Sequence, residues 1–333
     1  MQKKNSVSMV HEAQKLRILY MGTPDFAVEP LRLLHEQGYN IVGVVTVPDK
    51  PAGRGQKVKQ SAVKQYAMSC NLPIYQPEKL KDTQFIDEVK SLNPDLAIVV
   101  AFRMLPEVIW RIPRLGTFNL HASLLPNYRG AAPINWAIIN GERTTGVTTF
   151  LIDREIDTGN ILLQRDVAIG SNDTAGELHD KLMVVGAKLV EETVRAIATS
   201  EVKPTPQQNL LSSTKAVNTA PKLFKDTTRI DWSWPAGKVH NFIRGLSPYP
   251  AAWCELLGTN SDAVGVKIFR SEQCTTDKPT EVGMIYTDGK SYLEVGCGAG
   301  RIRVIELQLA GKRKLPVTDF LKGYRDVEQS VFK

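Results

Sequence analysis

The sequence predicts an α/β protein: a Rossmann-like, mostly parallel sheet with helices on both faces, followed by a smaller β-barrel domain. Up to about residue 200, short apolar runs of strand length alternate with helical stretches. This alternation is typical of a parallel sheet that helices cover on both sides. After residue 250, five short strand-like runs separated by glycine-containing turns indicate the barrel. A chain of 333 residues is long enough for both domains.

The first predicted strand, residues 16–21, ends at Gly22 and leads into a helix. We expect Thr23 to be the N-cap of this helix, with Pro24 at its first position and Asp25 in its first turn. No Gly-x-Gly-x-x-Gly motif is present, so the dinucleotide-binding fingerprint is absent. Further strands are expected at residues 40–47, 95–102, 117–121, 147–152 and 161–168, and helices at residues 28–36, 62–69 and 82–91.

A capping box, Thr174 to Glu177, opens a long helix that should end near residue 198 and close the first domain. The following segment is rich in Pro, Gln, Asn, Ser, Thr and Lys, which predicts a linker on the surface. After it we expect a helix at residues 236–246 and strands at residues 252–257, 264–269, 283–286, 292–295 and 302–309. The predicted organisation is a mobile extension (1–15), a first domain (16–199), a linker (200–228) and a C-terminal domain (229–333).

The composition favours a globular protein of the cytoplasm. Hydrophobic residues make up 42% of the chain, but no run approaches the length of a membrane span, and the first residues lack the apolar stretch of a signal peptide. The four cysteines are far apart and suggest neither a zinc site nor disulfides. The net charge of +7 is compatible with a polyanionic partner without establishing one.

The chemistry is expected in the stretch from Gly116 to Gly130. Alternate residues of a strand share a face, so Asn119 and His121 should project together. An amide that can donate to an oxyanion, beside an imidazole that can move a proton, is what acyl transfer requires. On the pair alone, a hydrogen-bonded core histidine with a strand-end asparagine is the more common explanation. More sequence is needed to favour the catalytic interpretation.

Further motifs favour the catalytic interpretation. Asn-x-His-x-Ser-Leu-Leu-Pro at residues 119–126 is followed some thirty residues later by Asp157-Thr-Gly. Three further blocks are Met-Gly-Thr-Pro-Asp-Phe-Ala at 21–27, Pro-Ala-Gly-Arg-Gly at 51–55 and Arg-Ile-Asp-Trp at 229–232, and the first motif continues as Leu-Leu-Pro-Asn-Tyr-Arg-Gly-Ala-Ala-Pro-Ile at 124–134. Together these blocks resemble the formyltransferases that use 10-formyltetrahydrofolate. Among them the chain is most similar to those that act on methionyl-tRNA. The resemblance extends from about Leu16 to the C-terminus.

The resemblance implies roles for particular residues. Asn119 and a protonated His121 would stabilise the oxyanion, and Asp157 would set the charge and orientation of His121 and help to move protons. Asp153 competes with Asp157 for this role, but Asp157 matches the family motif. The folate donor would contact the segments Phe102, Arg103, Met104, Leu105 and Ser123, Leu124, Leu125, Pro126. Arg103 departs from the family pattern, which commonly has Tyr-Gly where Phe102 and Arg103 stand.

The loop at residues 48–64 is basic, with five positive side chains against one carboxylate. A basic, glycine-containing loop suits contact with phosphates, although such a loop can also be simply solvated. The resemblance implies that this loop enters the acceptor arm of tRNA and that the C-terminal barrel is an OB-like fold that also binds tRNA. The expected tRNA-binding residues of the loop are Lys50, Arg54, Lys57 and Lys59.

The predicted function is therefore formyl transfer from 10-formyltetrahydrofolate to the amino group of methionyl initiator tRNA. We expect a monomer that uses no metal. Two alternatives stay open: a formyltransferase or hydrolase that acts on a small amine or on the donor itself, and a non-catalytic RNA-binding protein on the same fold. The first would not need the basic loop and the second domain together, and intact Asn119, His121 and Asp157 count against the second.

Overall fold

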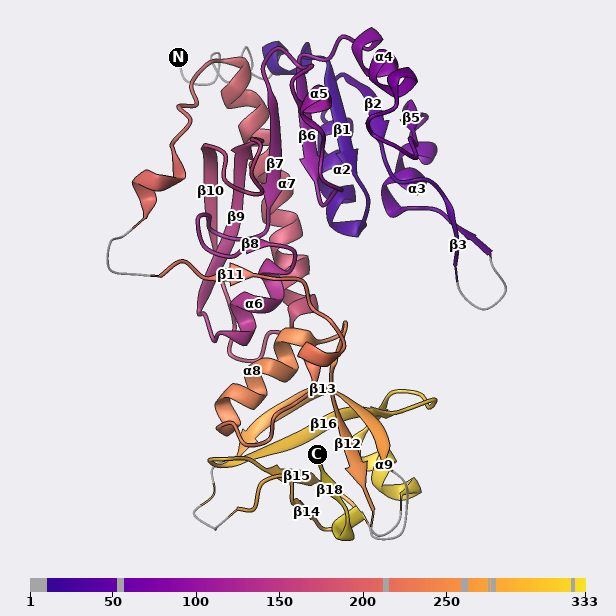
Figure 1. Ribbon diagram of the computed structural model, residues 1–333, viewed down its shortest axis with the longest axis vertical. Coiled ribbons are helices and arrows are strands. Elements are labelled where there is room, and N and C mark those ends of the chain that lie inside the picture. The colour runs from indigo at the N-terminus through magenta and orange to yellow at the C-terminus, as the bar shows by residue number, and fades with distance from the viewer. Residues whose placement is uncertain are drawn as a thin grey trace. The chain divides into compact units, whose positions relative to one another are not determined.

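The computed structural model describes residues 11–52, 57–211, 216–258, 263–274, 276, 280–324 and 327–333 (Figure 1). The chain divides into two compact units. The first contains residues 1–129, 146–167 and 179–218. The second contains residues 130–145, 168–178 and 219–333. No helix in these described segments is long and apolar enough to cross a membrane.

The first unit is built on a seven-stranded sheet with the order β10-β9-β7-β6-β1-β2-β5. Its strands are β1 Ile18–Gly22, β2 Ile41–Val45, β5 Ile74–Tyr75, β6 Leu96–Val100, β7 Thr117–His121, β9 Thr144–Leu151 and β10 Ile161–Ala168. The pairs β1–β2, β1–β6, β2–β5 and β6–β7 are parallel, while β7 and β9 are antiparallel. The predicted Rossmann-like, mostly parallel sheet is confirmed.

Helices cover both faces of this sheet (Figure 1). They are η1 Asp25–Ala27, α2 Val28–Glu36, α3 Ala62–Ser69, α4 Thr83–Ser91, α5 Glu107–Trp110 and α7 Ala175–Ala198. On one face Met21 packs in a core cluster with Phe85 of α4 and Ile109 of α5. On the other face Gly186 of α7 lies so close to Leu120 of β7 that a side chain at Gly186 would need Leu120 to move. The alternation of side chains along each strand therefore supplies two apolar layers.

The start of the first helical region differs from the expectation. Pro24, rather than Thr23, occupies the N-cap position of η1, and no side chain caps this helix. The hydroxyl of Thr23 is buried without a hydrogen-bond partner among the described residues. Of the expected N-terminal extension, residues 1–10 lie outside the described residues. Residues 11–14 are helical, and Ala13 is fully buried.

The basic loop after β2 contains a hairpin that the sequence did not predict. Strands β3 Lys50–Ala52 and β4 Lys57–Lys59 are antiparallel, with Lys50 directly opposite Lys59. Arg54 lies outside the described residues.

The second unit contains an antiparallel barrel with the strand order β14-β15-β16-β13-β12-β18, and β17 pairs with β16. The strands are β12 Ala252–Leu257, β13 Val264–Cys274, β14 Ile285–Thr287, β15 Leu293–Gly296, β16 Arg301–Leu309, β17 Leu315–Pro316 and β18 Val331–Phe332. An isolated bridge between Met284 and Val331 connects the two ends of this order and nearly closes the barrel. The expected five strands are present, and two shorter strands were missed.

Helices complete the second unit: α6 Pro133–Ile139, α8 Ala236–Leu246, α9 Val317–Gly323, η3 Asp226–Thr228 and η4 Val327–Gln329. Trp232 is buried in the barrel core and stacks on Phe332. The predicted capping box is present, since Glu177 accepts from the N–H of Thr174 and Thr174 accepts from the N–H of Glu177.

Candidate active site

The candidate site lies at the carboxyl ends of β6 and β7. These strands are parallel neighbours, so the loops that follow them leave from the same edge of the sheet. Asn119 and His121 share one face of β7, while Phe118 and Leu120 are buried on the opposite face. The strand pleat alone therefore brings the amide and the imidazole to one side.

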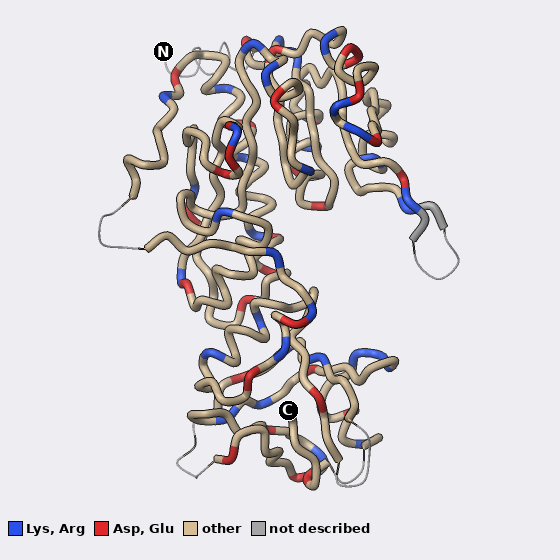
Figure 2. The backbone as a smooth tube through the Cα atoms, viewed as in Figure 1, with Lys and Arg blue, Asp and Glu red and all other residues tan. Residues whose placement is uncertain are grey.

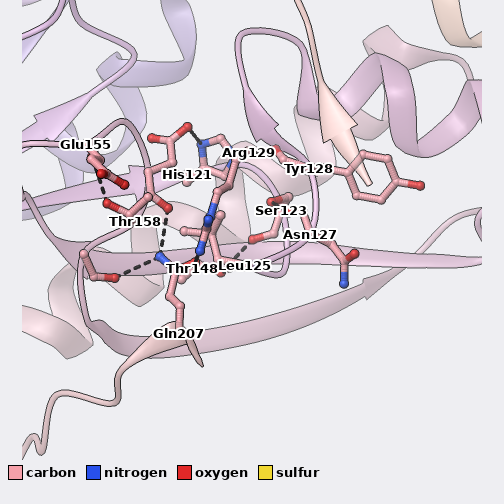
Figure 3. Close-up of polar contacts among 12 residues, drawn as sticks. His121, Ser123, Leu125, Asn127, Tyr128, Arg129, Thr148, Glu155, Thr158 and Gln207 are labelled. Carbon is pink, nitrogen blue, oxygen red and sulfur yellow. Dashed lines mark hydrogen bonds and ion pairs between the residues drawn. The ribbon is translucent and has the colours of Figure 1, made fainter. Parts of the chain in front are cut away.

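Two protein groups contact the buried imidazole of His121. Its Nε2 lies 2.9 Å from the carbonyl oxygen of Tyr128, and its Nδ1 lies 3.7 Å from Oδ2 of Asp157 (Figure 3). A carbonyl oxygen only accepts hydrogen bonds, so Nε2 must carry a proton. Nδ1 then faces the carboxylate, and the two are best matched when Nδ1 is also protonated. The 3.7 Å separation is longer than a direct hydrogen bond, so the contact between Nδ1 and the carboxylate is mainly electrostatic.

Both residues that contact His121 have a strained backbone. Tyr128 has φ +60° and Asp157 has φ +56°, in the left-handed region that costs a residue other than glycine about 1–2 kcal/mol. Such strain persists only where the surroundings hold it, and it concentrates at functional sites. The two conformations place a carbonyl and a carboxylate against His121.

The carboxylate beside His121 belongs to Asp157 and not to Asp153. Asp157 is 13% exposed in its ion pair with His121. Asp153 is exposed and accepts a hydrogen bond from the N–H of Arg154. Gly159 completes the loop, because a Cβ there would lie 1.7 Å from the carbonyl oxygen of Leu151. The Asp-Thr-Gly motif thus combines a charged residue with the glycine that lets its loop approach β9.

The side chain of Asn119 is partly exposed and has no hydrogen-bond partner among the residues that the structure describes. Its strand neighbours are Val99 on β6 and Phe150 on β9. An amide donor that is accessible and not consumed by the protein is suited to a substrate oxygen.

The loop at residues 102–105 has free backbone groups. Within the described chain, the backbone N–H and C=O groups of Phe102, Arg103, Met104 and Leu105 make no hydrogen bond. The preceding residue, Ala101, turns the chain at the end of β6 with φ +45°. A loop of this kind can bind a planar heterocycle through its backbone, whatever its side chains are.

The side chain of Arg103 binds other parts of the protein. Its guanidinium donates to the backbone carbonyls of Pro77 and Glu78 and lies 5.6 Å from the ring centroid of Phe102. Burial of the guanidinium lowers the pKa of Arg103 below its ordinary value. Arg103, which stands where the family commonly has Gly, therefore connects the loop at residues 102–105 to the segment that contains Pro77 and Glu78.

In contrast, the segment Ser123–Pro126 has backbone groups that already bond within the protein. Ser123, Leu125 and Pro126 are buried, and Leu124 is half-buried. Thr148 donates to the carbonyl of Ser123 and accepts from the N–H of Leu125. Of the four predicted folate-contacting residues here, Leu124 is the one whose side chain is partly accessible.

The basic hairpin carries two exposed, like charges. Lys50 and Lys59 lie opposite each other, and within the described chain neither has a carboxylate partner. Figure 2 colours the Lys and Arg positions blue, including those at the base of this hairpin. The neighbouring Asp49 is neutralised by Lys64 at 2.6 Å and bound by Gln76. Like charges directly across a hairpin are destabilising on their own, so the pair is suited to an anionic partner. Arg54 and the side chain of Lys57 lie outside the described residues.

Sequence reasoning missed three residues around His121: Tyr128, Arg129 and Gln207. Tyr128 and Arg129 belong to the family block at residues 124–134, so the resemblance offered a signal for them. Gln207 lies in the expected linker, where composition offered none.

Known proteins resemble this chain over nearly its whole length. Residues 14–194 match the formyl transferase family and residues 222–325 match its C-terminal domain. The chain belongs to the methionyl-tRNA formyltransferase family. It is 56% identical over 312 residues to the methionyl-tRNA formyltransferase of Bacteroides thetaiotaomicron, covering 94% of this chain and 97% of the relative. It is 50% identical over 310 residues to that of Flavobacterium johnsoniae, covering 93% and 96%.

Solved structures share the fold. WlaRD, a sugar 3N-formyl transferase whose structure was determined in the presence of dTDP and 5-N-formyl-THF, superposes with a TM-score of 0.63 at 21% identity, covering 90% of this chain and 99% of that one. HypX from Aquifex aeolicus, in complex with tetrahydrofolic acid, has a TM-score of 0.60 at 20% identity, covering 92% of this chain and 47% of HypX. The predicted enzyme class and formyl-transfer function are confirmed by the family.

Proposed function

We propose that Asn119, His121 and Asp157 transfer the formyl group of 10-formyltetrahydrofolate to the amino group of methionyl initiator tRNA. The observation that carries the proposal is the placement of Asp157 against Nδ1 of His121, on the face of β7 that also carries the free amide of Asn119. This arrangement lies in a chain more than half identical to a methionyl-tRNA formyltransferase.

The reaction is an acyl transfer. The amine attacks the formyl carbon, and the carbonyl oxygen becomes an oxyanion that Asn119 and protonated His121 stabilise by donating hydrogen bonds. The bond from the formyl carbon to N10 of the folate then breaks. N10 gains a proton, and the attacking amine loses one, through water and Asp157. The step uses protein side chains and no metal.

The proposal assigns the contact with the substrate oxygen to one ring nitrogen of His121. Because Nε2 donates to the carbonyl of Tyr128, the nitrogen that acts on the substrate is Nδ1. Asp157 faces the same nitrogen, so its negative charge supports the proton that Nδ1 donates. The prediction from the sequence did not distinguish the two nitrogens.

The formyl donor is proposed to bind at residues 102–105, through the free backbone groups of this loop, with Leu124 beside it. A pterin ring presents both donors and acceptors along its edge, which matches a backbone segment that has both unused. Ser123, Leu125 and Pro126 support the site from within.

The tRNA is proposed to contact the hairpin through Lys50, Arg54, Lys57 and Lys59, and the C-terminal domain at residues 229–333 through its barrel. Support for the barrel comes from Lys225, whose charged group lies 5.4 Å from the ring centroid of Trp253. Arg229 lies 5.2 Å from the same ring and is also paired with Glu255 at 2.6 Å. Cations beside an aromatic ring suit a nucleic acid. The chemistry is assigned to residues 16–199, and the enzyme is proposed to act as a cytoplasmic monomer.

The test supplies purified protein with 10-formyltetrahydrofolate and one of three acceptors: methionyl initiator tRNA, methionyl elongator tRNA, or a small primary amine such as an amino sugar nucleotide. The proposal expects N-formylmethionine on the initiator tRNA, little on the elongator tRNA and none on the small amine. Faster formylation of the small amine, or hydrolysis of the donor without transfer, would support the alternative enzyme function.

A further inference from the structure

Gln207 is a buried polar residue in a segment whose composition predicts a surface linker. It begins the short helix η2 Gln207–Leu210 and is 3% exposed, whereas its neighbour Gln208 is exposed. Two backbone hydrogen bonds of 2.8 Å between Thr205 and Ile161 fix the chain just before it to the start of β10. A buried amide on an otherwise exposed segment requires a specific set of partners.

The side chain of Gln207 uses all four of its hydrogen-bonding positions (Figure 3). Its Nε2 donates to the backbone carbonyls of Asp157, at 2.8 Å, and Gly159, at 2.9 Å. Its Oε1 accepts from Nε and Nη2 of Arg129, at 3.1 and 2.6 Å. These partners determine the orientation of the amide, because the opposite orientation would set one carbonyl against two others.

The two groups of partners belong to the two segments of the chain that contact His121. Asp157 faces Nδ1 of the imidazole, and Arg129 directly follows Tyr128, whose carbonyl accepts from Nε2. Both Asp157 and Tyr128 have the strained left-handed backbone and need support from outside their own loops. Gln207 bonds to the carbonyl of the strained Asp157 and to the side chain of Arg129, which directly follows the strained Tyr128.

We propose that Gln207 is a positioning residue for the reaction, which holds the Asp157 loop and the Tyr128–Arg129 turn at a fixed separation around His121. The inference rests on the proposed roles of His121 and Asp157. Gln207 touches no substrate and acts through the placement of Asp157. A displacement of about 1 Å in such a site can cost roughly a hundredfold in rate.

The experiment compares the variants Gln207→Leu, Gln207→Glu and Gln208→Leu in the full-length enzyme. Gln207→Leu should lower kcat about tenfold to a hundredfold per folded molecule, with the KM values for tRNA and formyl donor within about twofold of the parent. Gln208→Leu places the same side chain on the adjacent exposed position and should leave kcat unchanged.

Gln207→Glu separates the two sides of the contact. Its carboxylate still accepts from Arg129 but sets an oxygen against the carbonyls of Asp157 and Gly159. If Gln207 positions Asp157, Gln207→Glu should lower kcat as much as Gln207→Leu does. Recovery of kcat in Gln207→Glu would show that Gln207 serves Arg129 alone, and the proposal would be wrong. If Gln207→Leu does not fold, Gln207→Glu decides the question by itself.

A double variant distinguishes this inference from the proposed function. If Gln207 acts through Asp157, adding Gln207→Leu to Asp157→Asn should lower kcat little further. Two losses that multiply would overturn the inference while leaving the role of Asp157 intact. An Asp157→Asn enzyme with normal kcat would instead overturn the proposed role of Asp157.

Discussion

Two loops of the first unit differ in how their polar groups are satisfied. In the loop that carries Asp157, the backbone carbonyls of Asp157 and Gly159 are both bound by Gln207, and the carboxylate faces His121. In the basic hairpin, Lys50 and Lys59 are exposed and face each other across two short strands. Hydrogen bonds within the protein hold the first loop. In the hairpin, the two lysines have no carboxylate partner among the described residues.

The difference agrees with the roles that we propose for the two loops. Catalysis depends on positions that are correct to a fraction of an ångström, so the site is fixed by hydrogen bonds before the substrate arrives. Recognition of a phosphate backbone depends on charge at short range and tolerates small displacements. We expect substitutions in the first loop to act on kcat and substitutions in the hairpin to act on KM for tRNA.

The largest effect is expected for Asp157→Asn. This change keeps the size of the side chain and removes the charge beside Nδ1 of His121. A charge-assisted contact in such a site is worth roughly 2–4 kcal/mol, so kcat should fall about thirtyfold to a thousandfold. The measurement is single-turnover formylation, with the melting temperature recorded in parallel.

The matched control is Asp153→Asn, which removes an exposed carboxylate from the same loop and should leave kcat unchanged. An Asp157→Asn enzyme that melts far earlier but keeps normal turnover per folded molecule would mean that Asp157 only holds its loop.

The hairpin should show the opposite pattern in the double variant Lys50→Ala/Lys59→Ala. Loss of two phosphate-binding charges should raise KM for tRNA about fivefold to twentyfold and reduce its salt dependence, with kcat and KM for the donor nearly unchanged. Since the two lysines repel each other, the melting temperature should not fall. KM values measured at several salt concentrations check this.

The control for the hairpin removes two other exposed lysines, Lys15 and Lys90, each of which is paired with a carboxylate. The net charge changes equally in both double variants. An equal rise in KM for tRNA in the control would mean that total charge, and not the hairpin, attracts the tRNA.

Arg103→Met tests whether the loop at residues 102–105 is held in place by the protein, as the Asp157 loop is. The variant removes the hydrogen bonds to the carbonyls of Pro77 and Glu78 and leaves the apolar stem in place. We expect KM for the donor to rise about threefold to tenfold, because a loosened loop binds less well, while KM for tRNA stays the same.

Arg111→Met is the matched control for this prediction, since Arg111 also lies over an aromatic ring, that of Trp110, but is largely exposed. An unchanged KM for the donor in Arg103→Met would show that residues 102–105 keep their conformation without this connection.

The smallest effect is expected at the base of the hairpin, for Asp49→Asn. The hydrogen bond and charge of Lys64, with a further hydrogen bond from Gln76, lower the pKa of Asp49 below its ordinary value of 3.8. Because the pKa of Asp49 is lowered in the folded protein, its ion pair stabilises the fold at pH values above 3.8. This contribution is lost as the pH falls through the lowered pKa of the folded state. Asp49→Asn should therefore melt slightly earlier than the parent at pH 7 and pH 5, and the difference should shrink as the pH falls below 3.8. A difference that persists unchanged at low pH would mean that the charge of Asp49 is not responsible.

Much of the fold could be predicted because local patterns determine it. The strand at residues 117–121 and the helices at residues 62–69 and 236–246 have the predicted bounds, since each is set by a periodicity and its end signals within a few residues. The common face of Asn119 and His121 follows from the strand itself. Asp157 was identified by a motif, and its distance from His121 was beyond the reach of sequence reasoning.

The tertiary structure decided what depends on contacts between distant residues. Composition indicated a surface linker at residues 200–228, yet Gln207 is buried there, because its partners lie about 50 and 80 residues earlier in the chain. Arg103 binds two carbonyls some 25 residues away, and the barrel closes through Met284 and Val331. Local periodicity carries no information on such pairs, since the register of packed segments sets which polar groups meet. The sequence thus determined the elements and the chemical groups of the site, and the packing of the chain determined which side chains hold those groups in place.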